Sequence, residues 1–262
     1  MLRHLVASCG FALLLVPAAG FATTLPNPPF ASGGFVAPDK YVLKQEEYVK
    51  KLLGDYLKKR VKCDAIALVN LQLAYTPQNQ HKVPDIQASW QGCVQYANDW
   101  YAGHRDRLLL KGTPSCLDQT GIDAQKTAVD NQHASSVSAV YCDGDSAAPD
   151  PVTGFNIPDE KREVIGENEV AKIVLKAQLS ADKCYSRAAS YALRNGGTLD
   201  QYTLDKIQRC FDKISDHAAA AIADLDQMQK LPACLPPANA QSAVDAATAF
   251  SGTSTPAIYC QE

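Results

Sequence analysis

The stretch ADKCYSRAASYALRNGGTLDQYTLDKIQRC, residues 181–210, decides the fold. Its two cysteines, Cys184 and Cys210, lie at equal distances on either side of Gly197, which follows Gly196 in a pair that favours a turn. If both flanks are helical, a reversal at these glycines produces an antiparallel hairpin and brings the two cysteines level with each other. The spacing therefore predicts a helical hairpin closed by a disulfide.

The same arrangement occurs earlier in the chain, which indicates an internal duplication. Four cysteines follow one order in each half, and several of their neighbours match. The matching segments are Gly34-Phe35 with Gly154-Phe155, Lys62-Cys63 with Lys183-Cys184, Pro114-Ser115-Cys116-Leu117 with Pro232-Ala233-Cys234-Leu235, and Ala139-Val140-Tyr141-Cys142 with Ala257-Ile258-Tyr259-Cys260. We therefore expect tandem copies of one domain, residues 34–142 and 154–262.

The apolar pattern predicts that both copies are helical. In the first copy, Val49, Leu53 and Tyr56 begin a series with the three-and-four spacing of a buried helix face. A second helix is expected after Pro84, because proline is favoured in the first turn. The second helix of the second copy has the same pattern, with one apolar side made of Leu204, Ile207, Phe211, Ile214, Ala218, Ile222 and Leu225. The expected fold class is all-α.

The helix boundaries follow from capping residues and composition. Asp39 and Asp159 are placed as N-caps, because an aspartate side chain accepts hydrogen bonds from the first free N–H groups of a helix. A short third helix is expected in each copy, over residues 119–132 and 238–250. A strand over residues 137–141 is the alternative for the end of the first copy, since apolar and polar residues alternate weakly there.

Eight cysteines follow the N-terminal apolar segment, and their even number favours four disulfides. Cysteines at level positions on adjacent helices favour a disulfide within each hairpin. If every disulfide lies within one copy, the two cysteines that remain in each copy pair with each other. The predicted pairs are Cys63–Cys93, Cys184–Cys210, Cys116–Cys142 and Cys234–Cys260. A metal site is the alternative use of cysteine, but no pair has the C-x2-C spacing of zinc sites. No metal or other cofactor is therefore expected.

Residues 1–22 have the features of a secretory signal peptide. Arg3 supplies the positive charge, an apolar stretch follows, and Gly20-Phe21-Ala22 offers a small-residue cleavage site. Lipoprotein acylation at Cys9 is the alternative, although the apolar stretch follows this cysteine instead of preceding it. Residues 23–33 are proline-rich and are predicted to form an extended arm. No later stretch is long and apolar enough for a membrane span, so we expect a periplasmic or extracellular protein.

The formal net charge of −3 gives no reason to expect a nucleic-acid partner. Residues 143–153 form an acidic, proline-containing linker between the copies. A basic run, Lys58-Lys59-Arg60 with Lys62, lies on the first predicted helix. A solvated helix face is the simpler interpretation of this run, and docking of an acidic partner is the alternative.

No catalytic motif is evident in the sequence. The histidines His81, His104, His133 and His217 occupy no equivalent positions in the two copies and have no i, i+4 spacing, so a shared metal site is not predicted. Trp90, Tyr96, Trp100 and Tyr101 form an aromatic group on one predicted helix. Core filling is the simpler role for this group. The functional hypothesis is that Trp100 or Tyr101 contacts a partner, because tryptophan and tyrosine concentrate binding energy at interfaces.

The second copy also carries a C-x-P element, Cys234-Leu235-Pro236, between Cys210 and the final Cys260. This cysteine order resembles that of the periplasmic immunity proteins of the Tai type. The first copy has Asp118 where this element has its proline. The resemblance implies a small helical disulfide protein that binds and blocks cell-wall amidase effectors delivered by type VI secretion.

Together these features predict an exported, non-enzymatic protein-binding module, with an immunity-like inhibitor as its most specific form. The expected partner is another protein. A structural, envelope-associated protein is the first alternative and a hydrolase is the second. The sequence leaves the oligomeric state open.

Overall fold

The computed structural model describes residues 37, 39–144, 149–197 and 199–259. The predicted signal peptide, the predicted arm and Cys260 lie outside these residues. The described chain contains six α-helices and no strand. They are α1 (Lys40–Ala74), α2 (Val83–Leu110), α3 (Gln119–Val140), α4 (Lys161–Arg194), α5 (Gln201–Gln227) and α6 (Pro237–Ile258), with single 3-10 turns η1 (Gln80–Lys82) and η2 (Ser115–Leu117). The predicted all-α fold is confirmed.

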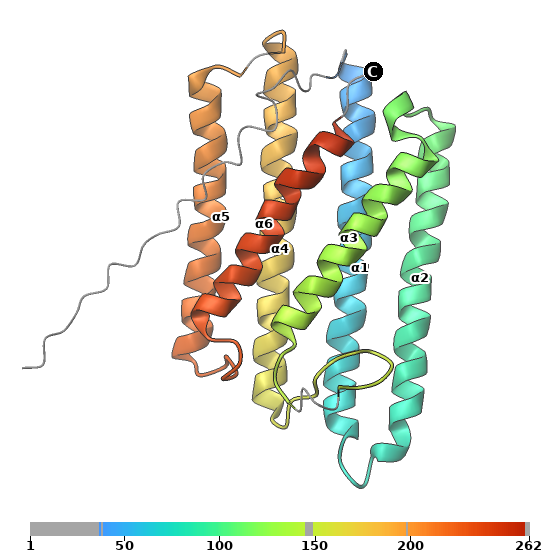
Figure 1. The fold of residues 1–262 in the computed structure, drawn as a ribbon, viewed down its shortest axis with the longest axis vertical. Coiled ribbons are helices and arrows are strands. Elements are labelled where there is room, and N and C mark those ends of the chain that lie inside the picture. Colours follow the sequence, from blue (N-terminus) through green and yellow to red (C-terminus); the bar gives the residue numbers. More distant parts are fainter. Residues whose placement is uncertain (1–36, 38, 145–148, 198, 260–262) are drawn as a thin grey trace, which may run out of the picture.

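The helices form two layers (Figure 1). In the view of Figure 1, α5, α4, α1 and α2 lie side by side in this order, and α6 and α3 cross in front of them at an angle. The two crossing helices run in opposite directions and pack against each other. The central helices α1 and α4 are also in contact, so the two predicted copies pack together. The helix order is compatible with an internal duplication, and the duplication itself stays a prediction.

The hydrophobic core extends across both predicted copies. One buried cluster contains Leu57 of α1 together with Ile258 of α6, and a second contains Leu71 of α1 together with Val244 of α6. Each half therefore completes the core of the other. The described helices include none that is both long and apolar enough to cross a lipid bilayer.

The turn between α4 and α5 forms where the glycine pair predicts it. Gly196 and Gly197 have φ values of 62° and 97°, in the left-handed region that glycine adopts readily. The N–H of Gly197 donates to the carbonyl of Ala192 (2.9 Å), which closes the end of α4. Asp200 then caps α5 by accepting from the N–H of Thr203 (2.8 Å).

The capping predictions have different outcomes for α1 and α4. Asp39 caps α1, because its Oδ1 accepts from the N–H groups of Tyr41 (2.7 Å) and Val42 (2.9 Å). Asp159 does not cap α4, so that prediction is wrong. The N-cap is the next residue, Glu160, whose N–H donates to Glu163 Oε2 (3.2 Å). In a capping box the N–H of the N-cap residue donates to the side chain of the third helical residue, and Glu160 and Glu163 make this interaction here.

The third helix of each half is longer than predicted. Helix α3 continues to Val140, so the alternative of a strand over residues 137–141 is wrong. Helix α6 continues to Ile258. The weak alternation near Val137 is overridden by packing, because Val140 and the following Tyr141 are buried in the core.

The two hairpin disulfides are confirmed, and the other predicted pairings are wrong. Cys63 pairs with Cys93 and Cys184 with Cys210, at Cα–Cα distances of 5.8 and 6.0 Å. Cys142, however, pairs with Cys234, at a Cα–Cα distance of 6.0 Å. Cys116 is disulfide-bonded as well, and Cys260 lies outside the described residues. The antiparallel packing of α3 and α6 brings the residue after α3 next to the residues before α6, so this bridge links the two predicted copies.

The described part of the predicted linker is tied to the helices. Asp150 is buried and accepts hydrogen bonds from the Tyr75 hydroxyl (2.9 Å) and from Gln87 Nε2 (2.7 Å). The N–H and hydroxyl of Thr153 donate to the other carboxylate oxygen of Asp150 (both 2.8 Å). These bonds hold the chain between α3 and α4 against the ends of α1 and α2.

Candidate functional site

Two grooves flank the exposed side of α1, and together they form the best candidate for a binding surface. Neither groove is lined by a described residue of α3 or α6. The grooves share Lys51 and Asp55 of α1, so they are adjacent. We call them the α1/α2 groove and the α1/α4 groove.

The α1/α2 groove has a volume of ≈ 460 Å³. Trp100 and His104 of α2 line one side, and their rings stack with centroids 4.1 Å apart. Tyr48 of α1, of which 41% is exposed, lines the other side. Arg107 and Lys111 add positive charge near the end of α2. The groove thus combines aromatic faces with cations.

The α1/α4 groove has a volume of ≈ 320 Å³. Gly54 on α1 allows a close approach of the two helices, because a Cβ there would lie 2.9 Å from Leu179 Cδ2. Lys58 and Lys183 line the groove, and Lys50 and Asp182 lie at its base. Lys58 forms an ion pair with Asp55 (2.7 Å) at the surface.

The two grooves carry an excess of positive charge although the protein is acidic overall. Six basic residues line them, against three acidic residues. Lys50 and Lys58 are paired with Asp182 and Asp55. The other four basic side chains are exposed and form no ion pair with another described residue: Lys51, Arg107, Lys111 and Lys183. This surface is therefore suited to an anionic partner.

The predicted basic run divides between the surface and the interior. Lys58 and Lys62 are exposed. Lys59 lies over the ring of Trp100 at 4.7 Å and that of Tyr96 at 5.4 Å, within cation–π range. Arg60 is half-buried and pairs with Asp130 of α3 at 3.8 Å. The run is thus neither a wholly solvated face nor a single docking patch.

The two predicted partner-binding aromatics face different environments. Trp100 is half-buried in the α1/α2 groove, so its contact with a partner stays a prediction. Tyr101 is only 2% exposed, and its hydroxyl donates to the carbonyl of Ile122 (3.1 Å). Tyr101 is therefore buried in this structure, so the predicted contact of Trp100 or Tyr101 with a partner rests on Trp100. Its burial and the negative charge of Asp123 raise the pKa of its hydroxyl.

Lys50 is the most deeply buried cation of this region. Its Nζ donates to Thr255 Oγ1 of α6 (2.7 Å) and lies 3.3 Å from Asp182 Oδ1 of α4. The rings of Tyr185 and Tyr259 lie 5.3 and 5.4 Å from Nζ. Burial lowers the pKa of Lys50, and Asp182 opposes this shift. The cluster joins three helices from both predicted copies.

Of the four histidines that follow the predicted signal peptide, His133 is the one whose environment resembles a catalytic pair. Its Nε2 lies 2.6 Å from Asp64 Oδ2, and Trp90 Nε1 donates to Asp64 Oδ1 (2.8 Å). Both members of the pair are at least 94% buried. The adjoining cavity has a volume of ≈ 20 Å³, enough for about one water molecule. It leaves no space for a substrate, so the pair is better explained as a buried polar contact between α1 and α3.

The other three histidines lie at the surface and are far apart in the chain. His81 is exposed in η1, His104 stacks on Trp100, and His217 lines a separate groove between α4 and α5.

The described residues contain one group of three potential metal-ligand atoms, from Cys142, Glu167 and Cys234. Its two sulfurs are joined in a disulfide, so neither is available as a thiolate ligand.

Glu167 is fully buried at the junction of α3, α4 and the segment before α6. Its Oε1 accepts from the N–H groups of Cys142 and Asp143 (both 2.8 Å), and Oε2 has no hydrogen-bond partner among the described residues. Burial raises the pKa of Glu167 to about 8 despite these two hydrogen bonds. A carboxyl group that is protonated at neutral pH explains how an oxygen without a partner can be buried there.

Sequence reasoning missed Lys50 and Glu167. A signal was present for Glu167, because Glu46 precedes Val49 by the same interval at which Glu167 precedes the matching Val170. Both glutamates are fully buried. Lys50 gave no comparable signal, because its partner Asp182 lies in the other half of the chain.

Comparison with models of protein families, with curated proteins and with solved structures finds no match.

Proposed function

We propose that the protein is a non-enzymatic, exported binding module that holds an acidic protein through the two grooves beside α1. The observation that carries this proposal is the set of four cations around Trp100 and Gly54 that have no ion-pair partner among the described residues. Unpaired surface cations attract an acidic partner and increase its association rate. The half-exposed Trp100 supplies an aromatic contact of the kind that concentrates binding energy.

The rigidity of the fold supports binding more than catalysis. Disulfides join α1 to α2 and α4 to α5, so the walls of both grooves belong to stapled hairpins. A surface that is already ordered loses little conformational entropy on binding. The His133–Asp64 pair lies beside a cavity with space for about one water molecule, which gives the hydrolase alternative no substrate site at that pair.

The most specific form of this proposal is an immunity-like inhibitor. It rests on the resemblance of the cysteine order to the Tai-type immunity proteins, whose targets are cell-wall amidases. On this proposal the signal-like residues 1–22 direct the protein to the periplasm, where its disulfides form. An acidic surface near the active site of the target would then meet the cations beside α1.

Calorimetric titration with poly-L-glutamate at low ionic strength tests the charge requirement directly. We expect the double variant Lys51→Glu, Lys183→Glu to bind roughly 10-fold more weakly than the wild type, because it reverses two groove charges. Lys172→Glu is the matched control, since Lys172 is exposed on α4 but lines neither groove. Equal weakening by the control, or no binding by the wild type, would count against the proposal.

A further inference from the structure

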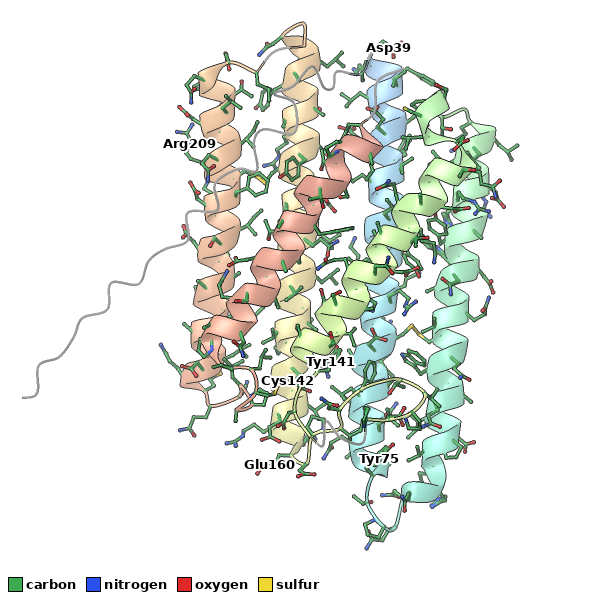
Figure 2. All side chains as sticks on the ribbon, viewed as in Figure 1. Asp39, Tyr75, Tyr141, Cys142, Glu160 and Arg209 are labelled. Carbon is green, nitrogen blue, oxygen red and sulfur yellow. A yellow bond between two sulfur atoms is a disulfide. The ribbon has the colours of Figure 1, made fainter. Side chains whose placement is uncertain are left out.

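The Cys142–Cys234 disulfide has an unusual neighbour. One oxygen of Glu167 and the two sulfurs all lie within 4.8 Å of one another. Glu167 belongs to α4, Cys142 follows α3, and Cys234 precedes α6, so three separate segments converge at the bridge. Figure 2 shows Cys142 directly after Tyr141 at the end of α3.

The access of solvent to the bridge distinguishes it from the two hairpin disulfides. Cys142 and Cys234 are both partly exposed. In each hairpin disulfide one cysteine is almost fully buried, with Cys63 at 3% and Cys184 at 1% exposure. A thiolate that attacks a disulfide must reach one of its sulfurs along the S–S axis. Cys93 and Cys210 are the partly exposed cysteines of the hairpin bridges, so Cys142–Cys234 differs from these two bridges in that both of its cysteines are partly exposed.

The carboxyl group of Glu167 is held beside the bridge. Its Oε1 is fixed by the N–H groups of Cys142 and Asp143, so the carboxyl group cannot turn away from the bridge. Its Oε2 is buried without a hydrogen-bond partner among the described residues, which suits the O–H of a neutral carboxylic acid. The other titratable groups that face Glu167 are Asp143, Glu163 and Tyr141. The two nearby carboxylates also favour the protonated form.

We propose that Cys142–Cys234 is a thiol–disulfide exchange site for an external dithiol, with Glu167 as the proton donor. A thiolate of the dithiol attacks Cys234 Sγ, and the Cys142–Cys234 bond breaks. Cys142 Sγ leaves with the electron pair and takes the proton of Glu167. The second thiolate of the dithiol then attacks its own sulfur in the mixed disulfide, and Cys234 Sγ leaves with the electron pair and takes a proton from water. The dithiol is oxidised to a disulfide, the bridge is reduced to two thiols, and Glu167 regains a proton from water.

The consequence of this exchange is a change in how the two halves are linked. The bridge closes a loop with a sequence separation of 92, and it ties the end of α3 to the start of α6. Reduction removes this link and leaves the hairpin disulfides Cys63–Cys93 and Cys184–Cys210 in place. Each half then keeps its own hairpin, and the end of α3 is no longer joined to the segment before α6 through Cys142 and Cys234.

Timed reduction with dithiothreitol at pH 6.5, followed by alkylation and peptide mass mapping, tests the proposal on the full mature chain. We expect Cys142 and Cys234 to be labelled roughly 10-fold faster than the cysteines of either hairpin bridge. Glu167→Gln should slow the reduction of Cys142–Cys234 by roughly 10-fold or more, because the amide cannot supply a proton. Glu46→Gln is the matched control, at the equivalent position of the first copy, and should leave this rate unchanged.

A pH series on the wild type gives a readout that does not depend on how the variant folds. The rate for Cys142–Cys234, divided by that for Cys184–Cys210, should fall as the pH rises through about 8, where Glu167 loses its proton. The ratio cancels the general increase in dithiothreitol thiolate. Equal rates for the three bridges at every pH, or a ratio that Glu167→Gln does not change, would overturn the proposal.

Discussion

Lys50 of α1 and Asp182 of α4 form an ion pair across the contact between the two predicted copies, with Nζ 3.3 Å from Oδ1. Their side chains are 5% and 18% exposed. Thr255 of α6 accepts a hydrogen bond from the same ammonium group, so one buried cation joins three helices. The pair lies at the base of the α1/α4 groove and connects the stability of the fold to the proposed binding surface.

Removal of one member of this pair should destabilise the protein far more than removal of both. Asp182→Ala leaves Lys50 buried without its counter-charge, and we expect a loss of about 3 kcal/mol in the free energy of unfolding. The double variant Lys50→Met, Asp182→Leu should recover most of that loss. Urea denaturation measures both. The surface pair Lys172–Glu169 is the control, and Lys172→Met should cost less than about 1 kcal/mol.

The raised pKa of Glu167 should make the free energy of unfolding depend on pH. Its pKa is about 8 in the folded protein, against 4.5 for an unperturbed glutamate. Between these values the folded state binds a proton that the unfolded state has released, so the contribution of Glu167 to stability falls as the pH rises from about 4.5 to about 8. The total decrease should be on the order of a few kcal/mol. Denaturation at several pH values should show a flatter profile for Glu167→Gln, and an unchanged profile would contradict this assignment.

Glycine substitutions should have opposite effects at Gly166 and Gly103. A Cβ at Gly166 would collide with the carbonyl group of Lys230, so Gly166→Ala should destabilise the protein by about 1–3 kcal/mol. Gly103 lies within α2, and a Cβ at this position would meet no atom within 4 Å. Gly103→Ala should therefore stabilise the protein by about 0.5–1 kcal/mol. Thermal unfolding of the two variants checks both signs.

Substitutions of the neighbouring residues Trp100 and Tyr101 should affect binding and stability differently. Tyr101→Ala empties a buried site and should destabilise the fold by about 3–5 kcal/mol. Trp100→Ala should cost less stability, because Trp100 is half-buried, but it should weaken binding of an acidic partner. Unfolding and titration experiments on both variants distinguish the two roles. A Trp100→Ala variant that binds with unchanged affinity would remove Trp100 from the proposed surface.

The fold features that the sequence predicts well are local ones. The hairpin between Cys184 and Cys210 follows from the turn at Gly196 and Gly197 and from helical flanks, all within one continuous stretch. The pairing of Cys142 with Cys234 depends on how α3 and α6 pack. That packing is set by tertiary contacts, which apolar periodicity within one helix does not reveal. Confinement of the disulfides to each copy was therefore the wrong assumption.

The candidate site was predictable only in part, for a similar reason. Trp100 and Tyr101 are adjacent on α2, and successive helical residues point in directions about 100° apart. The sequence shows that one of them can face outward, but the position of α3 decides that Tyr101 is the buried one. The basic residues of α1 were visible in the sequence, whereas their alignment with Lys183 and Arg107 depends on the contacts of α1 with α4 and α2.

Photo-crosslinking in the native envelope fraction tests the central claim, that the grooves beside α1 bind an acidic protein. A benzophenone amino acid at Tyr48, in the α1/α2 groove, is compared with one at Tyr202, which is 62% exposed on α5. We predict one dominant protein adduct, with an acidic surface, from position 48 and not from position 202. Lys51→Glu, Lys183→Glu should abolish this adduct while Lys172→Glu retains it. The same adduct from both positions, or one that persists after the charge reversal, would contradict the claim.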